Sequence, residues 1–432
     1  MRTSAAGKTV FSFLLSMTLF LQFPFVSYAE ITGAIRDQKG KAPAEGAWLD
    51  EQIWADGSQY ENPPTEVEWV RIGLNYGDSA IEEAVFINAS GQGFCLGTYD
   101  ETRQFTELAR TDKSALQIYC AEEEEYGLLA VDAQEEELLY YSGTGHLAIR
   151  PIGGETYYNG DRFRGGFECV QTDRNLVSVI NVVQLEDYVK GVLPYEMANN
   201  WPQEALKAQA VCARTYAVYN QNAYEEYGFD LTDNTESQVY RGTTEANAWT
   251  DAAADATAGE LIRYRGEICE IYYFAADGGA TEDGRWVFDT DRPYLLGKLD
   301  PFEKAVEYSF QFWYREYTGE EIAERLVGKG FSLSKVVALE PKLSPVGNVI
   351  AITFVDEEGE RLLIEGRRCY TVLGLNDCRF SVRKTEDGFL LQGSGLGHNC
   401  GMSQWGAKAM DEIYGYDYRE IIGFYYTGAY VA

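Results

Sequence analysis

The stretch after Trp201 constrains the fold of this 432-residue chain more than any other part of it. Alanine dominates its interior, and Pro202 stands where a first helical turn needs no N–H. The pattern therefore predicts a helix from about 202 to 224, capped by Asn199 or Asn200. Small residues recur on one face of that helix, at Leu206, Ala210, Ala213 and Ala217. Such a narrow stripe predicts that another element packs very close to the helix backbone.

Glu196, a few residues before this helix, is the least expected residue of the stretch. An apolar run stops at Pro194, and Glu196 then stands between Tyr195 and Met197. Glutamate is ordinarily a solvated surface residue. The pattern leaves two interpretations open. Glu196 is either a structural carboxylate paired with Arg214, or a reactive acid whose pKa is raised by burial so that it donates a proton near neutral pH.

Charge and the N-terminus place the chain in a broad class. The formal net charge of −32 argues against nucleic acid, and against an anionic membrane surface as the main partner, because both attract positive charge. Arg2 and Lys8 precede an uncharged apolar stretch that ends at Ala29. This predicts that residues 1–29 are a signal peptide or a retained membrane anchor. In either case we expect an exported protein, at the outer face of the cytoplasmic membrane or in the cell wall.

The remaining chain predicts an α+β fold. Residues 30–66 are polar and indicate a linker, residues 67–155 a β-rich N-terminal region, and residues 156–432 a mixed domain. Short apolar runs predict strands at 67–74, 84–87, 128–131, 146–152 and 176–183. Asn159-Gly160 predicts a hairpin turn. The charged run 122–125 is expected to be a solvated loop.

Short helices are expected between and after these strands. A helix at 185–191 would end at Gly191, and a second alanine-rich helix at 245–258 would be capped by Thr244. Residues 261–275 predict a hairpin that turns at Arg265-Gly266. Further helices and strands are expected at 320–329, 336–339, 349–355, 403–414 and 418–426.

The residues present exclude most site chemistries. His146 and His398 are the only histidines, and the eight cysteines form no C-x-x-C pair, so no zinc-binding cluster is predicted. The glycine-rich loop 393–401 fits neither a phosphate loop nor a dinucleotide fingerprint. A triad built on His398 and Ser403 would lack a nucleophile elbow. Acid–base chemistry by a carboxylate such as Glu196 remains.

Five motifs carry a family resemblance. The chain contains G-V-L-P-Y-E-M at 191–197, W-P-Q-E-A-L-K-A-Q-A-V-C-A-R-T-Y-A at 201–217, S-Q-V-Y-R-G at 237–242, D-G-G-A-T-E at 277–282 and G-L-G-H-N-C-G-M-S-Q-W-G-A at 395–407. These motifs are long and occur in a fixed order. The chain resembles the stage II sporulation protein D (SpoIID) family from about Val67 to its C-terminus.

The resemblance implies a lytic transglycosylase that acts on peptidoglycan glycan strands freed of stem peptides. It would cleave the MurNAc–GlcNAc bond and leave a 1,6-anhydro-MurNAc end, during engulfment in endospore formation. Glu196 would be the catalytic acid and base, with Arg214 as a second catalytic residue. One carboxylate suffices because the 6-hydroxyl of the sugar replaces water, unlike in two-carboxylate glycosidases. The resemblance also implies an amidase partner that removes the stem peptides.

Further residues are expected to contact the substrate. The resemblance places His398, Ser403 and Gln404 along a substrate groove formed by the alanine-rich helix and β-hairpins. Lys207 or Arg214 would offset the negative charge of the protein near the lactyl carboxylates of the strand. Two more residues, Gln209 and Tyr273, complete the expected substrate-binding set.

The chain also departs from the family pattern. Some members bind zinc through Cys and His in the loop before S-Q-V-Y, but here residues 230–238 contain neither. Many members have His-Ser-Thr where this chain has Ala275-Ala276-Asp277. No metal or other cofactor is therefore expected. An alternative to the enzyme is a non-catalytic peptidoglycan-binding module that enhances a wall amidase.

Overall fold

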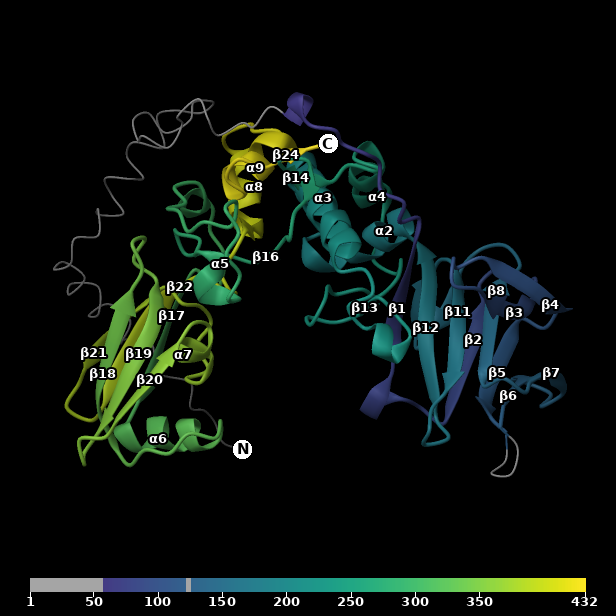
Figure 1. Ribbon diagram of the computed structural model, residues 1–432, viewed down its shortest axis with the longest axis horizontal. Coiled ribbons are helices and arrows are strands. Elements are labelled where there is room, and N and C mark those ends of the chain that lie inside the picture. Colours follow the sequence, from purple (N-terminus) through teal and green to yellow (C-terminus); the bar gives the residue numbers. More distant parts are fainter. Residues whose placement is uncertain (1–56, 122–125) are drawn as a thin grey trace, which may run out of the picture. The chain divides into compact units, whose positions relative to one another are not determined.

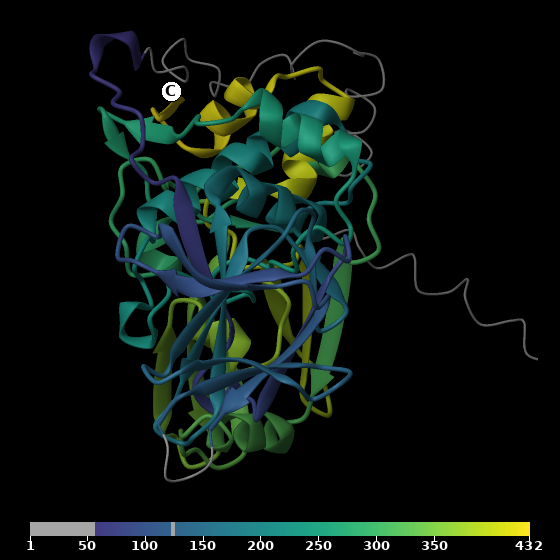
Figure 2. The same cartoon turned by 90° about the vertical axis from the view of Figure 1, so that its right-hand side faces the viewer.

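The computed structural model describes residues 57–121 and 126–432 (Figure 1). The predicted signal or anchor segment, most of the linker and the charged run 122–125 lie outside these residues. Within the described ranges, no helix combines the length and the apolar character needed to cross a membrane. Helices and strands form largely separate groups, which confirms the α+β class. Figures 1 and 2 show strands β1 to β12 gathered apart from helices α3, α8 and α9.

The β-rich part consists of two sheets. One has the strand order β13-β1-β12-β11-β8-β3-β4 and the other β10-β9-β2-β5-β6-β7. The strands are β1 Trp69–Asn75, β2 Glu83–Asn88, β3 Phe94–Tyr99, β4 Phe105–Thr111, β5 Ala115–Cys120, β6 Leu128–Asp132, β7 Leu138–Ser142, β8 His146–Pro151, β9 Thr156–Tyr158, β10 Asp161–Phe163, β11 Gly166–Gln171, β12 Val177–Gln184 and β13 Leu231–Thr232. Every strand predicted in this region is present.

The two sheets share one apolar core. Phe86 of β2 and Phe167 of β11 belong to different sheets, and their ring centroids lie 4.9 Å apart. Strand β12 is buried along almost its whole length, as its β-branched sequence predicts. Strands on both sides of residue 155 contribute to both sheets, so the sheets themselves do not divide at the predicted domain boundary. The predicted turn at Asn159-Gly160 is confirmed, with positive φ angles of 51° and 89°.

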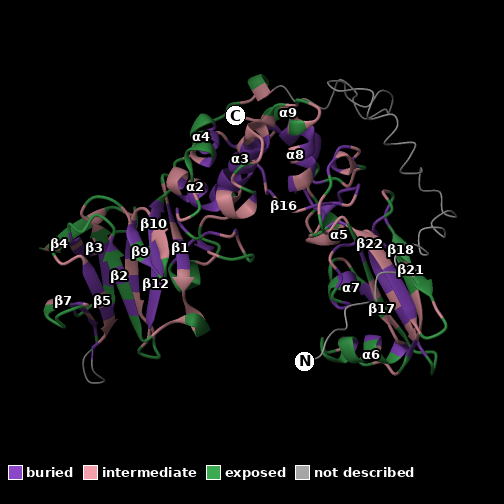
Figure 3. Ribbon diagram, turned by 180° about the vertical axis from the view of Figure 1, so that it is seen from behind, coloured by how far each residue is buried: buried purple, intermediate pink, exposed green. Residues whose placement is uncertain are grey.

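The helical part packs around α3. The helices are α2 Leu185–Glu196, α3 Gln203–Tyr219, α4 Ala248–Ala256, α5 Gly284–Val287, α8 Gln404–Glu412 and α9 Tyr418–Tyr425. The small stripe of α3 is buried, and Figure 3 shows most of this helix in the colour of buried residues. Its close neighbours are α2, α4, α8 and α9. The prediction that another element packs very close to this helix is therefore correct.

Helix α2 is longer than predicted. Gly191 does not end it, and the helix continues through Pro194 to Glu196, where the N–H of Met197 donates to the carbonyl of Leu193 at 3.1 Å. Gly191 serves close packing instead, because a Cβ atom there would lie only 2.4 Å from Cε2 of Tyr240. The glycine was a packing requirement and not a stop signal.

The predicted helix caps are also wrong. Neither Asn199 nor Asn200 caps α3. The carboxylate of Asp411 accepts the N–H groups of Glu204 at 2.7 Å and Ala205 at 3.1 Å. The helix ends at Tyr219, several residues earlier than predicted. Helix α4 is capped by Asn247, because its side chain accepts the N–H groups of two first-turn residues, which the predicted Thr244 does not reach.

A third part of the chain has its own core. It contains β17 Phe312–Tyr317, α6 Gly319–Val327, β18 Val336–Leu343, β19 Val349–Asp356, β20 Arg361–Glu365, α7 Arg368–Thr371, β21 Phe380–Lys384 and β22 Phe389–Ser394. The strands form two three-stranded sheets, β17-β22-β21 and β18-β19-β20. Their buried faces and α6 enclose one apolar cluster that includes Trp313, Ile352 and Leu391.

Short strands connect the helical part to the C-terminus. They are β14 Ile262–Tyr264, β15 Glu267–Ile268, β16 Tyr273–Phe274, β23 Met402–Ser403 and β24 Tyr430–Val431. The turn predicted at Arg265-Gly266 is present, but the hairpin is short and does not reach residue 275. Strand β16 leaves it to pair in parallel with β23, which brings Tyr273 opposite Met402.

Candidate active site

Glu196 is the last residue of α2, and its side chain is partly buried. Its Oε1 atom accepts the backbone N–H of Val239 at 3.0 Å, and its Oε2 atom accepts a hydrogen bond from Nε2 of Gln404 at 3.3 Å. The hydroxyl of Tyr273 also interacts with the carboxylate. Three segments far apart in the sequence therefore meet at this one carboxylate, and none of them brings a positive charge to it.

The surroundings of Glu196 favour its neutral form. Burial raises the pKa of Glu196 above its ordinary value, while hydrogen bonds from Val239, Gln404 and Tyr273 oppose the shift. Burial, followed by the negative charge of Glu196, raises the pKa of Tyr273 well above its ordinary value, so its hydroxyl keeps its proton. Glu196 is thus suited to hold a proton at a pH where an exposed glutamate has lost it.

Glutamine side chains surround this carboxylate. Nε2 of Gln404 lies 3.4 Å from Oε1 of Gln209, which is fully buried and whose own Nε2 has no acceptor in the described chain. Tyr273 donates its hydroxyl to Oε1 of Gln238 at 2.8 Å, and Gln238 donates to the hydroxyl of Tyr188 at 3.1 Å. These bonds fix the orientation of the groups around Glu196. Gln238 was missed as a site residue, although it lies within the S-Q-V-Y-R-G motif that carried the resemblance.

Arg214 does not reach this site. Its guanidinium is fully buried and forms a two-point ion pair with Glu186, at 2.8 Å and 2.6 Å. It also donates to the carbonyls of Glu260 and Ala254, each at 3.3 Å. No contact joins Arg214 to Glu196 among the described residues. The structure therefore supports neither the expectation that Arg214 orients Glu196 nor the alternative that the two residues form an ion pair. Arg214 instead connects α2, α3 and the end of α4.

Two more predicted residues have partners elsewhere. Ser403 is fully buried, donates to Oε2 of Glu303 at 2.6 Å and accepts the N–H of Gly406 at 3.0 Å, so it caps α8. Lys207 forms an ion pair with Glu204 at 2.6 Å. Neither residue contacts Glu196, because the burial of one and the ion pair of the other hold them elsewhere. Of the predicted residues, the structure brings together Glu196, Gln209, Tyr273 and Gln404.

His398 has a structural environment. Its Nδ1 accepts the N–H of Cys400 at 3.1 Å, and its ring lies 4.8 Å from that of Phe288 and 5.2 Å from that of Phe274. Burial, with a smaller contribution from Arg367, lowers its pKa to about 3. The imidazole is therefore neutral near pH 7. It holds the glycine-rich loop in shape and makes no contact with Glu196.

A buried acidic cluster contacts Ser403, the residue that caps the start of α8. Carboxylate oxygens of Asp277, Asp300 and Glu303 all lie within 4.8 Å of one another. The Glu303 carboxylate accepts two backbone N–H groups and the hydroxyls of Ser403 and Tyr308. Oδ2 of Asp277 has no donor. Burial and the charges of Glu303 and Asp300 raise the pKa of Asp277 well above its ordinary value, so its carboxyl group favours the protonated form.

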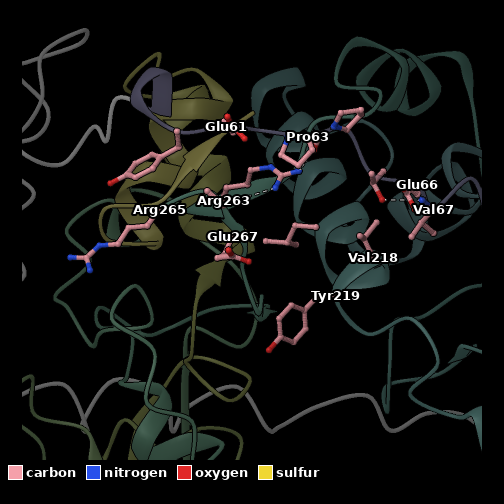
Figure 4. Close-up of a pocket in the computed structure, with 14 residues that line it drawn as sticks. Glu61, Pro63, Glu66, Val67, Val218, Tyr219, Arg263, Arg265 and Glu267 are labelled. Carbon is pink, nitrogen blue, oxygen red and sulfur yellow. Dashed lines mark hydrogen bonds between the residues drawn. The ribbon is translucent and has the colours of Figure 1, made fainter.

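A separate cavity lies between the lead-in segment 60–67, the end of α3 and the β14–β15 hairpin (Figure 4). Its volume is about 820 Å³. Arg263 crosses its edge and donates to the carbonyls of Pro63 at 2.5 Å and Gly266 at 3.0 Å. None of the predicted site residues lines this cavity. Its walls mix both charges with apolar groups, and they indicate no particular ligand.

Comparison with known proteins identifies the family. The sequence model of the SpoIID family, described as stage II sporulation protein, matches residues 173–264, which include Glu196 and α3. An uncharacterized protein from Brachyspira hyodysenteriae is 34% identical over 62% of this chain and 72% of its own length. The chain belongs to the SpoIID family. The stage II sporulation protein D of Bacillus subtilis is 29% identical over 58% of this chain and 75% of its own length.

One SpoIID relative has a different name. The amidase enhancer of Bacillus subtilis is 27% identical over 56% of this chain, but the match spans only 39% of that protein. Membership of the SpoIID family therefore connects this chain both to a protein named for sporulation and to one named for its effect on an amidase.

Proposed function

We propose that this SpoIID protein is a lytic transglycosylase that cleaves MurNAc–GlcNAc bonds in peptidoglycan strands without stem peptides. The observation that carries the proposal is Glu196: a partly buried carboxylate with a raised pKa, two hydrogen-bond donors and the Tyr273 hydroxyl around it, and no ion pair with any cation of the described chain. A merely structural glutamate in this position would be expected to pair with an arginine such as Arg214. Arg214 is paired with Glu186 instead, which leaves Glu196 available.

The proposed reaction needs only this one carboxyl group. Protonated Glu196 gives its proton to the glycosidic oxygen as the bond from that oxygen to C1 of MurNAc breaks. The 6-hydroxyl of the same MurNAc bonds to C1 and gives its proton to the Glu196 carboxylate, which restores the starting state. No water is consumed, and the new end is 1,6-anhydro-MurNAc. Positioned acid–base catalysis of this kind contributes about 10²–10⁴-fold to a rate.

The neighbours of Glu196 have distinct parts in this proposal. Gln404 and the N–H of Val239 hold the carboxylate in place and stabilise its ionised form after the first proton transfer. Tyr273 stays protonated, and its hydroxyl, which donates to Gln238, lies beside the carboxylate. Gln209 is fully buried, and its side-chain oxygen lies 3.4 Å from Nε2 of Gln404, so it helps to orient Gln404. Burial of Glu196 acts against these hydrogen bonds: it raises the pKa and so favours the protonated acid before the reaction starts.

Mass spectrometry of denuded glycan strands tests the proposal. The wild-type protein is expected to release fragments with anhydro-MurNAc ends, while Glu196→Gln, which preserves shape and hydrogen-bonding capacity, releases none. The matched control makes the same change at an exposed glutamate: Glu267→Gln should leave product formation unchanged. A change at Arg214 does not serve as a control, because its side chain is fully buried. If the wild type produces no anhydro ends, the protein is not this enzyme.

A second function is supported by the relative named amidase enhancer. In that case the chain would bind glycan strands and stimulate an amidase without cutting them. Glu196→Gln would then leave stimulation of amidase activity intact, whereas a transglycosylase that prepares strands would lose it. We further propose export to the wall and a role in engulfment during endospore formation, beside an amidase that removes stem peptides. The names of the sporulation and amidase relatives support that setting.

A further inference from the structure

Strand β17 presents two aromatic rings to solvent. Phe312 is 71% exposed and Tyr314 is 66% exposed, the highest values among the large hydrophobic residues of the described chain. Alternation along the strand puts both rings on one face, while Trp313 points inward and donates its Nε1–H to the carbonyl of Gly395 at 3.1 Å. Single exposed hydrophobic residues are normal, whereas contiguous exposed apolar groups mark binding surfaces, so two rings on one face of a sheet are a candidate for such a surface.

The neighbouring side chains on this face are polar. Register places Gln392 of β22 beside Tyr314 and Ser394 beside Phe312, and Ser381 of β21 lies beyond Gln392. The side-chain amide of Gln392 makes no hydrogen bond to any other described residue, and Arg383, on the same face, forms no ion pair there. Ser394 already donates its hydroxyl to the carbonyl of Gly278, and alternation puts the exposed Glu316 on the same face. The face therefore combines two flat apolar rings with polar and charged side chains, unlike the continuous apolar patch typical of a protein interface core.

A chain of aromatic contacts leads from Glu196 towards this face. Gln404, which donates to Glu196, is followed by Trp405, whose ring centroid lies 4.8 Å from that of Trp201 and 4.9 Å from that of Tyr308. Tyr308 in turn lies 4.8 Å from Phe310, two residues before β17. Lys408 lies over the ring of Trp405 at 5.0 Å. The series of ring contacts ends at Phe310, and Phe312 follows it by two residues, so the exposed rings lie next along the chain to aromatic residues that pack beside the candidate active site.

We propose that Phe312 and Tyr314 form an additional glycan subsite that holds a strand whose cleavable bond lies at Glu196. The C–H faces of pyranose rings are apolar and pack on the electron-rich faces of aromatic rings, while the hydroxyl edges need hydrogen-bond partners such as Gln392 and Ser381. Arg383 lies where it can pair with a lactyl carboxylate. The inference rests on the proposed function for its substrate, but the subsite lies outside residues 173–264, which the family model matches.

Binding experiments separate this subsite from catalysis. The Glu196→Gln protein, which cannot cleave, carries the double change Phe312→Ala/Tyr314→Ala, and its affinity for denuded strands is measured by co-sedimentation and calorimetry. We expect Kd to rise about tenfold, as for removal of well-placed aromatic contacts. Tyr157→Ala, at an exposed tyrosine of strand β9, is the control and should leave Kd unchanged. Tyr314→Phe should also retain binding, because the ring remains.

Oligomers of N-acetylglucosamine provide a second probe. Short oligomers fill only the positions near Glu196, so the double change should not weaken their binding, whereas long oligomers should lose the advantage that the exposed rings give them. Arg383→Ala should weaken denuded strands but not these oligomers, which carry no lactyl carboxylate. Circular dichroism and thermal unfolding confirm that the exposed substitutions leave the fold intact.

Each outcome decides one way. Equal Kd values for the double variant and its parent on long strands would overturn the subsite. Retained strand binding combined with loss of an amidase partner would also overturn it, since the face would then be a protein interface. Absence of cleavage by wild type, with the tenfold loss of strand binding still present, would reject the transglycosylase and leave the subsite standing.

Discussion

At the scale of single residues, the site depends on one carboxylate whose neighbours act in opposite directions. Burial pushes the pKa of Glu196 upward, and the donors Gln404, Tyr273 and Val239 hold it down. The sequence could identify Glu196 as unusual because a glutamate between an aromatic residue and a thioether is rarely solvated. It could not show which groups contact the carboxylate, because Gln404 lies 208 residues away.

The pH dependence of activity should follow this balance. If Glu196 must start protonated, kcat/KM falls as pH rises through its pKa, and because that pKa is raised, activity persists above the range of an ordinary glutamate. Tyr273→Phe removes a hydrogen bond that lowers the pKa, so the falling limb should move to higher pH. Measurement of kcat/KM across a pH series checks this. A shift to lower pH would mean that the tyrosine does not stabilise the ionised carboxylate.

Arg214 should behave as a structural residue. Glu186→Gln leaves its buried guanidinium without a counter-charge, so we expect the free energy of unfolding to fall by about 3 kcal/mol. Urea denaturation measures this loss. The position of the falling pH limb should not move, because neither residue contacts Glu196. Arg174, which is exposed with its partner Asp78, offers the control: Asp78→Asn should change stability by less than about 1 kcal/mol.

At the scale of elements, loops and helix ends are joined by buried polar groups. The acidic cluster connects the loop at Asp277 to Glu303 and, through Ser403, to the start of α8, whose first residue, Gln404, contacts Glu196. Asp411 near the end of the same helix caps α3. These joints hold α8 against α3, and they explain why Gln404 and Gln209 meet. Sequence patterns predicted the helices themselves but none of these connections.

The cluster makes stability depend on pH in a defined direction. The pKa of Asp277 is raised in the folded state, so between its unfolded and folded pKa values the folded protein binds more protons than the unfolded one. The stabilisation that protonated Asp277 contributes to the fold is therefore complete below about pH 4 and is lost as pH rises. Asp277→Asn should remove this loss. The free energy of unfolding of the variant, relative to that of the wild type, should therefore increase from acidic to alkaline pH.

Urea unfolding at several pH values tests the Asp277 prediction. Asp291→Asn is the control, because Asp291 is exposed and outside the cluster. The difference in unfolding free energy between each variant and the wild type is compared across pH, since other buried acids contribute a common background. An Asp277→Asn protein with the same pH slope as the wild type would show that Asp277 is ionised in the fold.

At the scale of the whole molecule, charge opposes the proposed substrate. The chain carries a formal net charge of −32, and denuded strands carry a carboxylate on each MurNAc. Lys207 does not offset this near Glu196, because it is paired with Glu204. The residues that contact the Glu196 carboxylate therefore do not offset the repulsion between the negatively charged protein and the strand. This repulsion should slow association of the strand.

Moderate salt should consequently raise activity on denuded strands. The screening length falls to about 10 Å at 0.1 M salt, which weakens long-range repulsion but leaves short hydrogen bonds largely intact. We expect kcat/KM to increase from low to moderate salt through association, with little change in kcat. Uncharged N-acetylglucosamine oligomers should bind with no such dependence. A steady fall of kcat/KM for the denuded strands would contradict this electrostatic account.

The sequence determined the local features of this protein. The turns at Asn159-Gly160 and Arg265-Gly266, the buried strand β12 and the alanine-rich helix all follow from preferences that act within a few residues. The motifs were also enough to identify the family and to select Glu196. Only the tertiary structure decided that Arg214 pairs with Glu186, that Gly191 serves packing, and that Ser403 and His398 are structural. Those outcomes depend on which groups meet across long stretches of chain, and local backbone preference does not encode such encounters.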